Sequence, residues 1–427
     1  MRSKSIGRVR VYQLDGNEWQ LRGNEINGKV RYGGFGIEVE INAAGTIVAI
    51  SESVDDVVKH PGNVEVYKFD GNDWVQLGQT LSGAENGERF GVSMSLDYLG
   101  TILAVGMPSF YVQNKTGSVQ VYRYENGSWQ PLGSRLDGVH RKDHFGASVS
   151  LNVSGTILVV GAPKSSLNET ESGYTQIFQL INNEWEQIGD YIFGMNKYDA
   201  FGRLNSAGNI VAIGAHREYL SVFEYINNSW LLKGSTIMTQ HENSGFGNYI
   251  SLNSVGDFLA VGMPSFNFNT GGADVGKIAT YKFIGNDWDK IGRDIYGEHE
   301  GDASGTGLSL NNRGSIVAIG ANGNDDGGYN AGHVRVYDLL ERVGIKEYSL
   351  KENAIVAYPN PANDILNIQA ESSISSIEIM NVLGQTLLTS KGKSNREQLD
   401  ISGLNAGNYF VKVVVGDGNK VLRVVKR

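Results

Sequence analysis

Residues 90 to 146 read FGVSMSLDYLGTILAVGMPSFYVQNKTGSVQVYRYENGSWQPLGSRLDGVHRKDHFG, and this stretch contains one complete unit of a repeat. It begins with Phe90-Gly91 and ends on Phe145-Gly146, where the same pattern starts again. The other copies, the last one degenerate, are Phe35-Gly36, Phe201-Gly202, Phe246-Gly247 and Ser304-Gly305. The six tryptophans are Trp19, Trp74, Trp129, Trp185, Trp230 and Trp288. Both markers are spaced 55, 55, 56, 45 and 58 residues apart, and this agreement establishes the repeat.

Each unit contains four runs with the character of β-strands. In the unit quoted above, Val92 to Leu96 alternates in size, and Thr101 to Val105 is an unbroken apolar run that suits burial on both faces. Ser118 to Tyr124 alternates, and Asn126-Gly127 favours a tight hairpin before the strand that holds Trp129. A repeated unit of four antiparallel strands is typical of a β-propeller blade.

The repeat resembles the FG-GAP repeat of integrin-alpha-like propellers. Phe145-Gly146 is followed by Gly161-Ala162-Pro163, and variants of the second motif begin at Gly106 and Gly262. The resemblance covers roughly residues 7 to 340. It implies an all-β fold, a β-propeller of six or seven four-stranded blades, for the domain of residues 1–340. We also expect Trp side chains to pack between blades and the glycines after Phe to permit close approach or a sharp turn.

The number of blades has two interpretations. Six copies contain a second strand, whereas seven copies contain a third strand, and the N-terminal blade is incomplete because it supplies only its second half. A six-bladed ring could close by lending the Trp19 strand to the last blade. Alternatively the natural chain is longer, has seven blades and starts upstream. We favour the second interpretation, because residues 1–19 also lack the apolar segment of a signal peptide.

Residues 341–354 break the repeat and are expected to form a linker, and residues 355–427 predict a small Ig-like β-sandwich of short alternating strands. This C-terminal segment resembles the type A C-terminal sorting domain of the type IX secretion system of Bacteroidetes. The motif residues are Tyr358, Pro359, Asn360, Pro361, Leu383, Gly384, Gly407, Tyr409 and Lys426. The resemblance implies secretion or display on the outer-membrane surface, with the type IX secretion machinery as a partner.

Composition excludes several classes of function. The net charge of −9 argues against nucleic-acid binding, and no apolar stretch is long enough for a transmembrane helix. Cysteine is absent, which excludes disulfides, thiol catalysis and Cys-ligated zinc. The calcium loop of the integrin version is missing, and the nearest stretch, 322–328, lacks its carboxylate spacing. We assign no cofactor or metal residue, and calcium stays an open alternative.

An acidic residue stands two positions before the Phe-Gly phase in several units. A ring of such carboxylates could bind a cation or a polar ligand. The interpretation that we favour is that they accept hydrogen bonds from backbone amides in the turn before each first strand. The residues are Glu88, Asp143, Asp199 and Asp302.

The loops between second and third strands vary most in length, and loops on a rigid scaffold usually carry recognition. Their aromatic residues, Tyr111, Tyr174, Phe266, Phe268 and Tyr329, are our candidates for ligand binding. We therefore expect an exported, adhesive, non-enzymatic protein that binds an extracellular protein or glycan. The alternative is a secreted polysaccharide-active hydrolase or lyase, although no catalytic residue is assigned. Two or three non-repeated charged residues near the propeller axis would favour the alternative.

Overall fold

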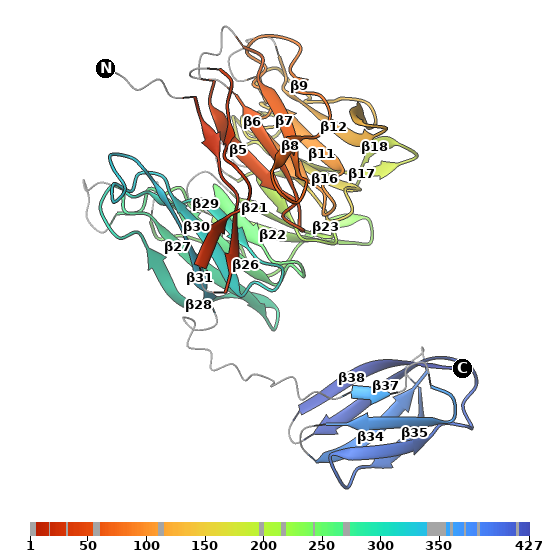
Figure 1. Cartoon of the computed structure of the whole chain (residues 1–427). Coiled ribbons are helices and arrows are strands. Elements are labelled where there is room, and N and C mark those ends of the chain that lie inside the picture. The colour runs from red at the N-terminus through yellow and green to blue at the C-terminus, as the bar shows by residue number, and fades with distance from the viewer. Residues whose placement is uncertain are drawn as a thin grey trace. The chain divides into compact units, whose positions relative to one another are not determined.

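The computed structural model describes residues 6–16, 18–30, 33–53, 60–109, 115–195, 200–214, 219–241, 244–267, 274–339, 356–358, 362–370, 373–381, 385–415 and 418–427. Every element defined within these ranges is a β-strand, as the sequence predicts, and the sheets are antiparallel (Figure 1). Two compact units divide the chain, Met1–Val343 and Gly344–Arg427. Among the described residues, no helix is long and apolar enough to cross a membrane.

The first unit repeats one sheet design. Four strands pair in chain order, and a short fifth strand returns to pair with the third. Sheet 1 consists of β5 (Phe35–Ile41), β6 (Ile47–Glu52), β7 (Asn63–Phe69), β8 (Trp74–Gln76) and β9 (Leu81–Ser82). Sheet 2 consists of β10 (Ser93–Leu96), β11 (Ile102–Met107), β12 (Ser118–Glu125), β13 (Ser128–Pro131) and β14 (Leu136–Asp137).

Sheets 3 and 4 have the same five strands. Sheet 3 consists of β15 (Ser148–Leu151), β16 (Ile157–Ala162), β17 (Tyr174–Ile181), β18 (Glu184–Gln187) and β19 (Ile192–Phe193). Sheet 4 consists of β20 (Phe201–Leu204), β21 (Ile210–Gly214), β22 (Tyr219–Ile226), β23 (Ser229–Leu232) and β24 (Ile237–Met238).

The remaining sheets of the first unit have fewer strands. Sheet 5 consists of β25 (Tyr249–Leu252), β26 (Phe258–Met263), β27 (Lys277–Ile284) and β28 (Asp287–Tyr296). Sheet 6 consists of β29 (Ser304–Leu310), β30 (Ile316–Ala321) and β31 (His333–Asp338). Near the N-terminus, β1 (Arg8–Val9) pairs with β4 (Ile26–Asn27), and β2 (Tyr12–Asp15) pairs with β3 (Glu18–Leu21).

The predicted strand characters are confirmed. The second strand of sheet 2 is buried along its whole length, and Leu103, Ala104 and Val105 are each 0% exposed. The third strand β12 is only partly buried towards its end. Hydrophobic burial of the second strands therefore supplies much of the core between consecutive sheets.

Tryptophan joins each of sheets 1 to 5 to the strands that precede it in the chain. Trp129 on β13 is 1% exposed, and its Nε1 donates a hydrogen bond to the carbonyl of Leu77 at 2.9 Å. The ring lies on Gly78, where an added Cβ would come within 2.8 Å of the Trp129 ring, so any side chain there would displace the ring. The same contact joins Trp74 to Gly23, Trp185 to Gly133, Trp230 to Gly189 and Trp288 to Gly234. The expected packing of Trp between repeat units is therefore confirmed.

The Phe-Gly pairs also have the expected structural role. Phe90 and Phe145 are 1% and 0% exposed. Gly91 has a φ of 88°, and an added Cβ would come within 2.7 Å of Val64 in the preceding sheet. A positive φ and a close approach both require glycine at this position.

A second series of contacts connects the turns between first and second strands. Asn152 accepts hydrogen bonds from the backbone amides of Thr156 and Ile157 at 2.8 and 2.9 Å, and it donates to the carbonyl of Ala207 in the next sheet at 3.2 Å. Backbone amides also bond from turn to turn, with distances of 3.0 to 3.2 Å. These bonds run from Ala43 to Tyr98, Tyr98 to Val153, Val153 to Ser206, Ser206 to Ser254 and Ser254 to Asn312.

The turns of all six sheets line one cavity of about 230 Å³. Its lining includes Ala43 from sheet 1, Tyr98 from sheet 2, Val153 from sheet 3 and Asn312 from sheet 6. The six turns therefore lie around a common centre rather than along an open row.

The two ends of the sheet series expose apolar side chains that the middle sheets bury. Ile37 and Val39 on β5 are 48% and 41% exposed, whereas the corresponding Met94 on β10 is 2% exposed. On β31 at the other end of the series, Val334 is 71% exposed. At the sheet 1 end, Val9 of β1 and Ile26 of β4 pack with Val48 and Ile50, so this outer face is covered only in part.

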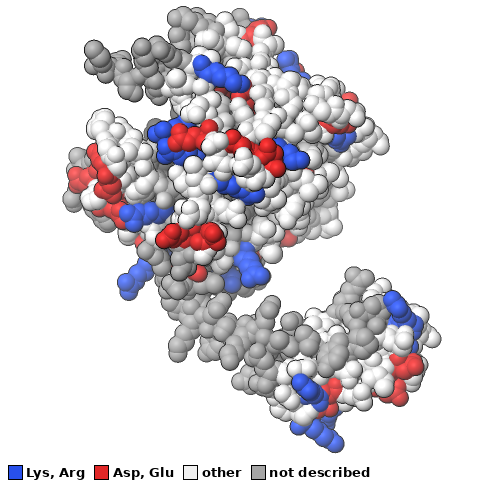
Figure 2. Space-filling view, in the orientation of Figure 1, with Lys and Arg blue, Asp and Glu red and all other residues white. Residues whose placement is uncertain are grey.

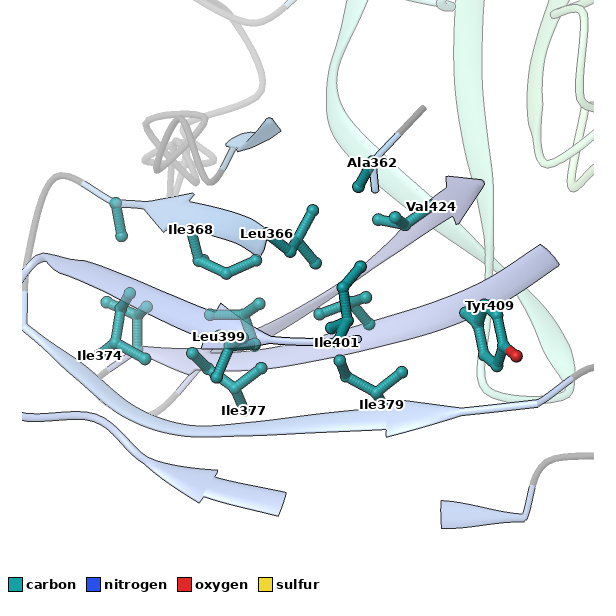
Figure 3. Packing of buried hydrophobic residues seen from close by; sticks show 14 residues of the cluster. Ala362, Leu366, Ile368, Ile374, Ile377, Ile379, Leu399, Ile401, Tyr409 and Val424 are labelled. Atoms are coloured by element: carbon teal, nitrogen blue, oxygen red, sulfur yellow. The ribbon is translucent and has the colours of Figure 1, made fainter. Parts of the chain in front are cut away.

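The second unit is a sandwich of two sheets. One sheet has the order β32 (Val356–Tyr358), β33 (Ile365–Gln369) and β36 (Arg396–Asp400). The other has the order β35 (Thr386–Lys391), β34 (Ile374–Met380), β37 (Gly407–Val415) and β38 (Gly418–Lys426). Leu366 and Ile368 of one sheet face Ile377 and Ile379 of the other across a core of buried aliphatic side chains (Figure 3). Alternating sequence thus gives each strand one buried face.

We predict that Trp129→Ala destabilises the first unit by about 3–5 kcal/mol, because it removes a buried ring and leaves a cavity over Gly78. Trp19→Ala is the matched control, since Trp19 is 52% exposed and should cost less than about 1 kcal/mol. Guanidinium unfolding followed by circular dichroism measures both changes. Similar losses for the two variants would show that the ring contact does not stabilise the sheets.

Candidate functional site

The sorting-motif residues lie in the second unit, where the segment after the first motif pairs with the C-terminal end of the chain. Ala362 follows the Tyr-Pro-Asn-Pro motif, and its amide donates to the carbonyl of Val425 at 2.8 Å. The Arg427 amide donates back to the carbonyl of Ala362 at 2.9 Å. The beginning and the basic end of the predicted sorting signal therefore form one pairing.

The other motif residues are placed as follows. Tyr358 ends β32, and Gly407 begins β37. Tyr409 is 9% exposed and donates to the carbonyl of Asn405 at 2.7 Å, so its ring belongs to the core. Lys426 is 7% exposed, and its Nζ lies 3.5 Å from Asp364 Oδ1. Pro359, Asn360, Pro361, Leu383 and Gly384 lie outside the described residues.

In the first unit, the variable loops meet the segments that precede the first strands. The amide of Ser109 donates to the carbonyl of Glu88 at 3.1 Å, and that of Lys164 donates to the carbonyl of Asp143 at 3.2 Å. A third such bond joins Ser265 to the carbonyl of Ser244 at 3.0 Å. We call this end of the sheets the loop end, and the opposite end, with the cavity between turns, the turn end.

The candidate aromatic residues have different environments at the loop end. Tyr174 is 0% exposed, packs 5.2 Å from the Tyr191 ring, and donates to Asp143 Oδ2 at 3.4 Å. Phe266 is 5% exposed. Tyr329 is 89% exposed. Tyr111 and Phe268 lie outside the described residues. Tyr174 and Phe266 are thus packing residues here, and only Tyr329 among the three described presents its ring to solvent, because loop residues can fold back onto the sheet.

The repeated acidic residues accept hydrogen bonds from turn amides, as we expected. Glu88 Oε2 accepts from the amide of Ala84 at 2.8 Å, and Asp143 Oδ2 accepts from the amide of His140 at 2.8 Å. Asp302 Oδ2 accepts from the amides of Glu298 and His299 at 2.8 and 3.0 Å. Asp199 lies outside the described residues.

Hydrogen bonds lower the pKa of Asp302 more than burial raises it. Its burial alone would raise the pKa, but the His299 amide, the Asn324 side chain and the Glu298 amide together lower it. The carboxylate is therefore held ionised as a structural acceptor. The repeated carboxylates stabilise turns, which leaves them little capacity for a ligand.

One cluster near the loop end has the donor types of a metal site. Glu298, His299 and Asp326 have ligand atoms within 4.8 Å of one another, and all three residues are exposed. Asp326 comes from the stretch 322–328, which the sequence brought to attention for calcium. Glu298 already forms an ion pair with Arg335. Exposure and this ion pair both weaken the cluster as a cation site.

The first strands carry charged residues that the repeat does not share. Glu40, Ser95, Ser150 and Arg203 occupy equivalent register positions, opposite Ala49, Ala104, Val159 and Ala212. Sheets 1 and 4 thus carry Glu40 and Arg203 at a position that is serine in the other four sheets. Comparing the copies position by position would have revealed Glu40 and Arg203, but the Phe-Gly motif drew attention to the shared residues instead.

Glu38 and Glu40 have perturbed acidity. Burial raises the pKa of Glu40 to about 8, neighbouring Glu38 raises it further, and Arg203 opposes both effects. The pKa of Glu38 is raised by burial and lowered by Arg203. A carboxyl that stays protonated at neutral pH can donate a proton or a hydrogen bond.

Charges elsewhere on the first unit are mixed. On the face shown in Figure 2, blue Lys and Arg side chains of the described residues lie next to red Asp and Glu side chains rather than forming a continuous basic surface. The pocket of about 260 Å³ beside Glu88 also has charges of both signs. There Lys115 lies 3.0 Å from Glu85 and 3.7 Å from Glu88, and Arg135 pairs with Asp137 at 2.9 Å.

We predict that Glu40→Gln changes how stability depends on pH. Below the ordinary glutamate pKa of 4.5, Glu40 is protonated in both the folded and the unfolded state and costs no stability. As the pH rises from there through about 8, the unfolded state loses the proton more readily than the folded state, so the wild type loses stability. The variant lacks this loss, so its melting temperature relative to wild type should increase between about pH 5 and pH 8. Glu125→Gln, at an exposed position, is the control. Parallel pH profiles for wild type and Glu40→Gln would refute the raised pKa.

Comparison with known proteins identifies the C-terminal segment. No curated protein matches the chain. Residues 356–427 match the family described as the secretion system C-terminal sorting domain. This match agrees with the motif residues described above and implies export through the type IX secretion system, an interaction with that machinery, and a destination at the cell surface or outside the cell.

Proposed function

We propose that the protein is an exported FG-GAP-like β-propeller that binds an extracellular protein or glycan through its loop end and has no enzymatic activity. The observation that carries this proposal is that Trp contacts join the repeated sheets into a scaffold and that the variable loops lie at one end of it. A rigid scaffold that presents variable loops is a common design for recognition. The sorting domain supplies the route to the cell exterior.

The propeller assignment is supported by the turn end. Consecutive sheets from 1 to 5 are linked by the same Trp contact, and backbone bonds between turns link all six sheets. The turns of six sheets line one cavity. In a propeller, radial packing covers both faces of each blade and protects its edges.

A second candidate function is a polysaccharide hydrolase or lyase. Glu38, Glu40 and Arg203 are non-repeated charged residues on first strands, which is the feature expected of an enzyme. A protonated Glu40 beside a second carboxyl would suit acid catalysis of glycoside cleavage. We rank this candidate second, because the loop end rather than the first strands differs most in length between units.

Activity towards polysaccharides separates the two candidates. A screen for reducing sugars and unsaturated products should detect no turnover by the wild type if the protein only binds. If the wild type turns over a polysaccharide and Glu40→Gln does not, the enzymatic function replaces the binding function as the proposal.

We predict that Tyr329→Ala weakens binding found on a glycan array or in a pull-down from culture medium by about tenfold, because an exposed ring is lost from the binding surface. Tyr98→Ala is the matched control, since Tyr98 is 49% exposed at the turn end. Unchanged binding by Tyr329→Ala would exclude this ring from the binding surface. Equal losses in both variants would point to destabilisation instead.

We predict that deletion of residues 352–427 leaves the first unit folded but retains it in the periplasm. Cell fractionation locates the truncated protein, and protease resistance of the first unit reports its folding. Fusion of residues 344–427 to a periplasmic reporter should carry that reporter to the surface. Surface delivery of the truncated protein would contradict the sorting role.

A further inference from the structure

A pocket of about 350 Å³ opens at the loop end between sheets 4 and 5. It lies beside the variable loop that joins β26 to β27, and it is the larger of the two loop-end pockets described. Sheet 5 has the small residue Ala279 where sheet 3 has the larger Gln176, and this difference in side-chain size leaves room for the pocket. The lining includes Gln240 and His241 after β24, Lys277, Ala279 and Tyr281 on β27, and Lys290 on β28.

Lys277 is an unusual residue for its place in the repeat. It pairs with Met263 at the end of the second strand, as Ser118 and Tyr174 pair with Met107 and Ala162 in sheets 2 and 3. Lys277 is 5% exposed, and its Nζ lies 4.3 Å from the centre of the Phe266 ring. Burial of a lysine at this position is costly and is not required by the fold, because the other units do without it.

Within the described part of the chain, the positive charge of the pocket is incompletely neutralised. Asp294 is the acidic partner, with Oδ2 3.5 Å from Lys277 Nζ and Oδ1 2.7 Å from Lys290 Nζ. Burial and nearby Lys277 lower the pKa of His241, so its imidazole is neutral at neutral pH. Among the described side chains, two ammonium groups therefore share the Asp294 carboxylate.

The acidic residue that other units place nearby is missing from this unit. Ser244 stands two positions before Phe246, where sheets 2 and 3 have the buried acids Glu88 and Asp143. In sheet 3, Tyr174 at the position of Lys277 reaches Asp143 at 3.4 Å. Ser244 is 1% exposed, and its Oγ has no hydrogen-bond partner among the described residues. The unit thus gains a buried cation and lacks the acid that sheets 2 and 3 have two positions before the Phe, so Lys277 and Lys290 both depend on Asp294.

Burial removes water from the Lys277 ammonium, and it lowers the pKa of that group although Asp294 opposes the shift. An anion in the pocket would supply the missing counter-charge in a site of low dielectric constant. Tyr281 is a neutral donor, because burial and Asp294 raise the pKa of its phenol to about 12. Gln240 is an exposed polar side chain at the rim.

The geometry favours a compact anionic ring over an extended peptide. Strand β27 is hydrogen-bonded to β26 on one side and to β28 on the other, so it offers no free edge for an added strand. Side-chain donors and aromatic surface around one cation match the hydroxyls, ring and carboxylate of an acidic sugar. We propose that this pocket binds a carboxylate-bearing residue of an acidic polysaccharide, with Lys277 as the charged contact. This inference rests on the proposed binding role of the loop end and specifies its ligand.

Calorimetric titration of the full chain with a galacturonate trisaccharide tests the inference. The matched probe is the same trisaccharide with its carboxyls methyl-esterified, which keeps the shape and removes the charge. We expect binding of the acid and at least about tenfold weaker binding of the ester, because a charge-assisted hydrogen bond is lost. Lys277→Met and Gln240→Glu should each weaken binding of the acid by at least about tenfold.

Lys233→Met is the control variant. Lys233 pairs with Glu224 at 2.7 Å and lies 4.4 Å from the centre of the Phe283 ring, so it resembles Lys277 but lies outside the pocket lining. It should bind the acid like the wild type. Gln240→Glu replaces an exposed side chain, so its result stands even if Lys277→Met fails to fold.

The remaining results would reject the pocket, its ligand class or the proposed function. Equal binding of acid and ester, no binding of the acid, or unchanged binding by Lys277→Met and Gln240→Glu would reject the pocket as an acidic-sugar site. Tighter binding of a polyglutamate peptide than of the trisaccharide would assign the pocket to a protein partner instead. Rejection of the pocket together with binding on the glycan array leaves the proposed function intact, whereas an absence of any glycan or protein binding rejects that function as well.

Discussion

The contact of a tryptophan ring with a glycine in the preceding sheet holds the first unit together. Trp129 covers Gly78 and donates to the carbonyl beside it, and four further tryptophans repeat this geometry. A single four-stranded sheet cannot bury both its faces, so its stability depends on its neighbours. The Trp rings join neighbouring sheets at their fourth strands, while a turn asparagine and backbone bonds join the turns that line the cavity. Loops at the other end are free to vary because neither series of contacts includes them.

Repeated and non-repeated residues have separate roles in this molecule. The positions that recur, including Phe145, Gly91 and Asp143, are buried, conformationally demanding or bonded to backbone amides. Residues that break the pattern, such as Glu40 on a first strand and Lys277 on a third strand, are ionisable groups whose charged forms burial disfavours. Stability explains the first class, and the second class costs stability that a ligand or a reaction could offset.

The second unit solves a different physical problem. Its sorting motifs are distant in sequence, yet Ala362 pairs with the last strand and Tyr409 anchors its hydroxyl on Asn405. The motifs therefore contribute to the fold of the domain that the secretion machinery receives. A small two-sheet core of aliphatic side chains is sufficient to present them.

The sequence by itself determined the all-β class, the repeat, the strand characters and the sorting domain. These follow from local periodicity and from motifs such as Phe-Gly, which require no knowledge of distant contacts. Even the glycine four residues after each tryptophan is visible in the sequence, although its partner is the tryptophan of the next unit. Only the tertiary structure decided that Tyr174 is buried while Tyr329 is exposed, and that Lys277 lines a pocket and lies 3.5 Å from Asp294. Burial and charge balance depend on which sheets meet, and loop residues carry no periodic signal of that packing.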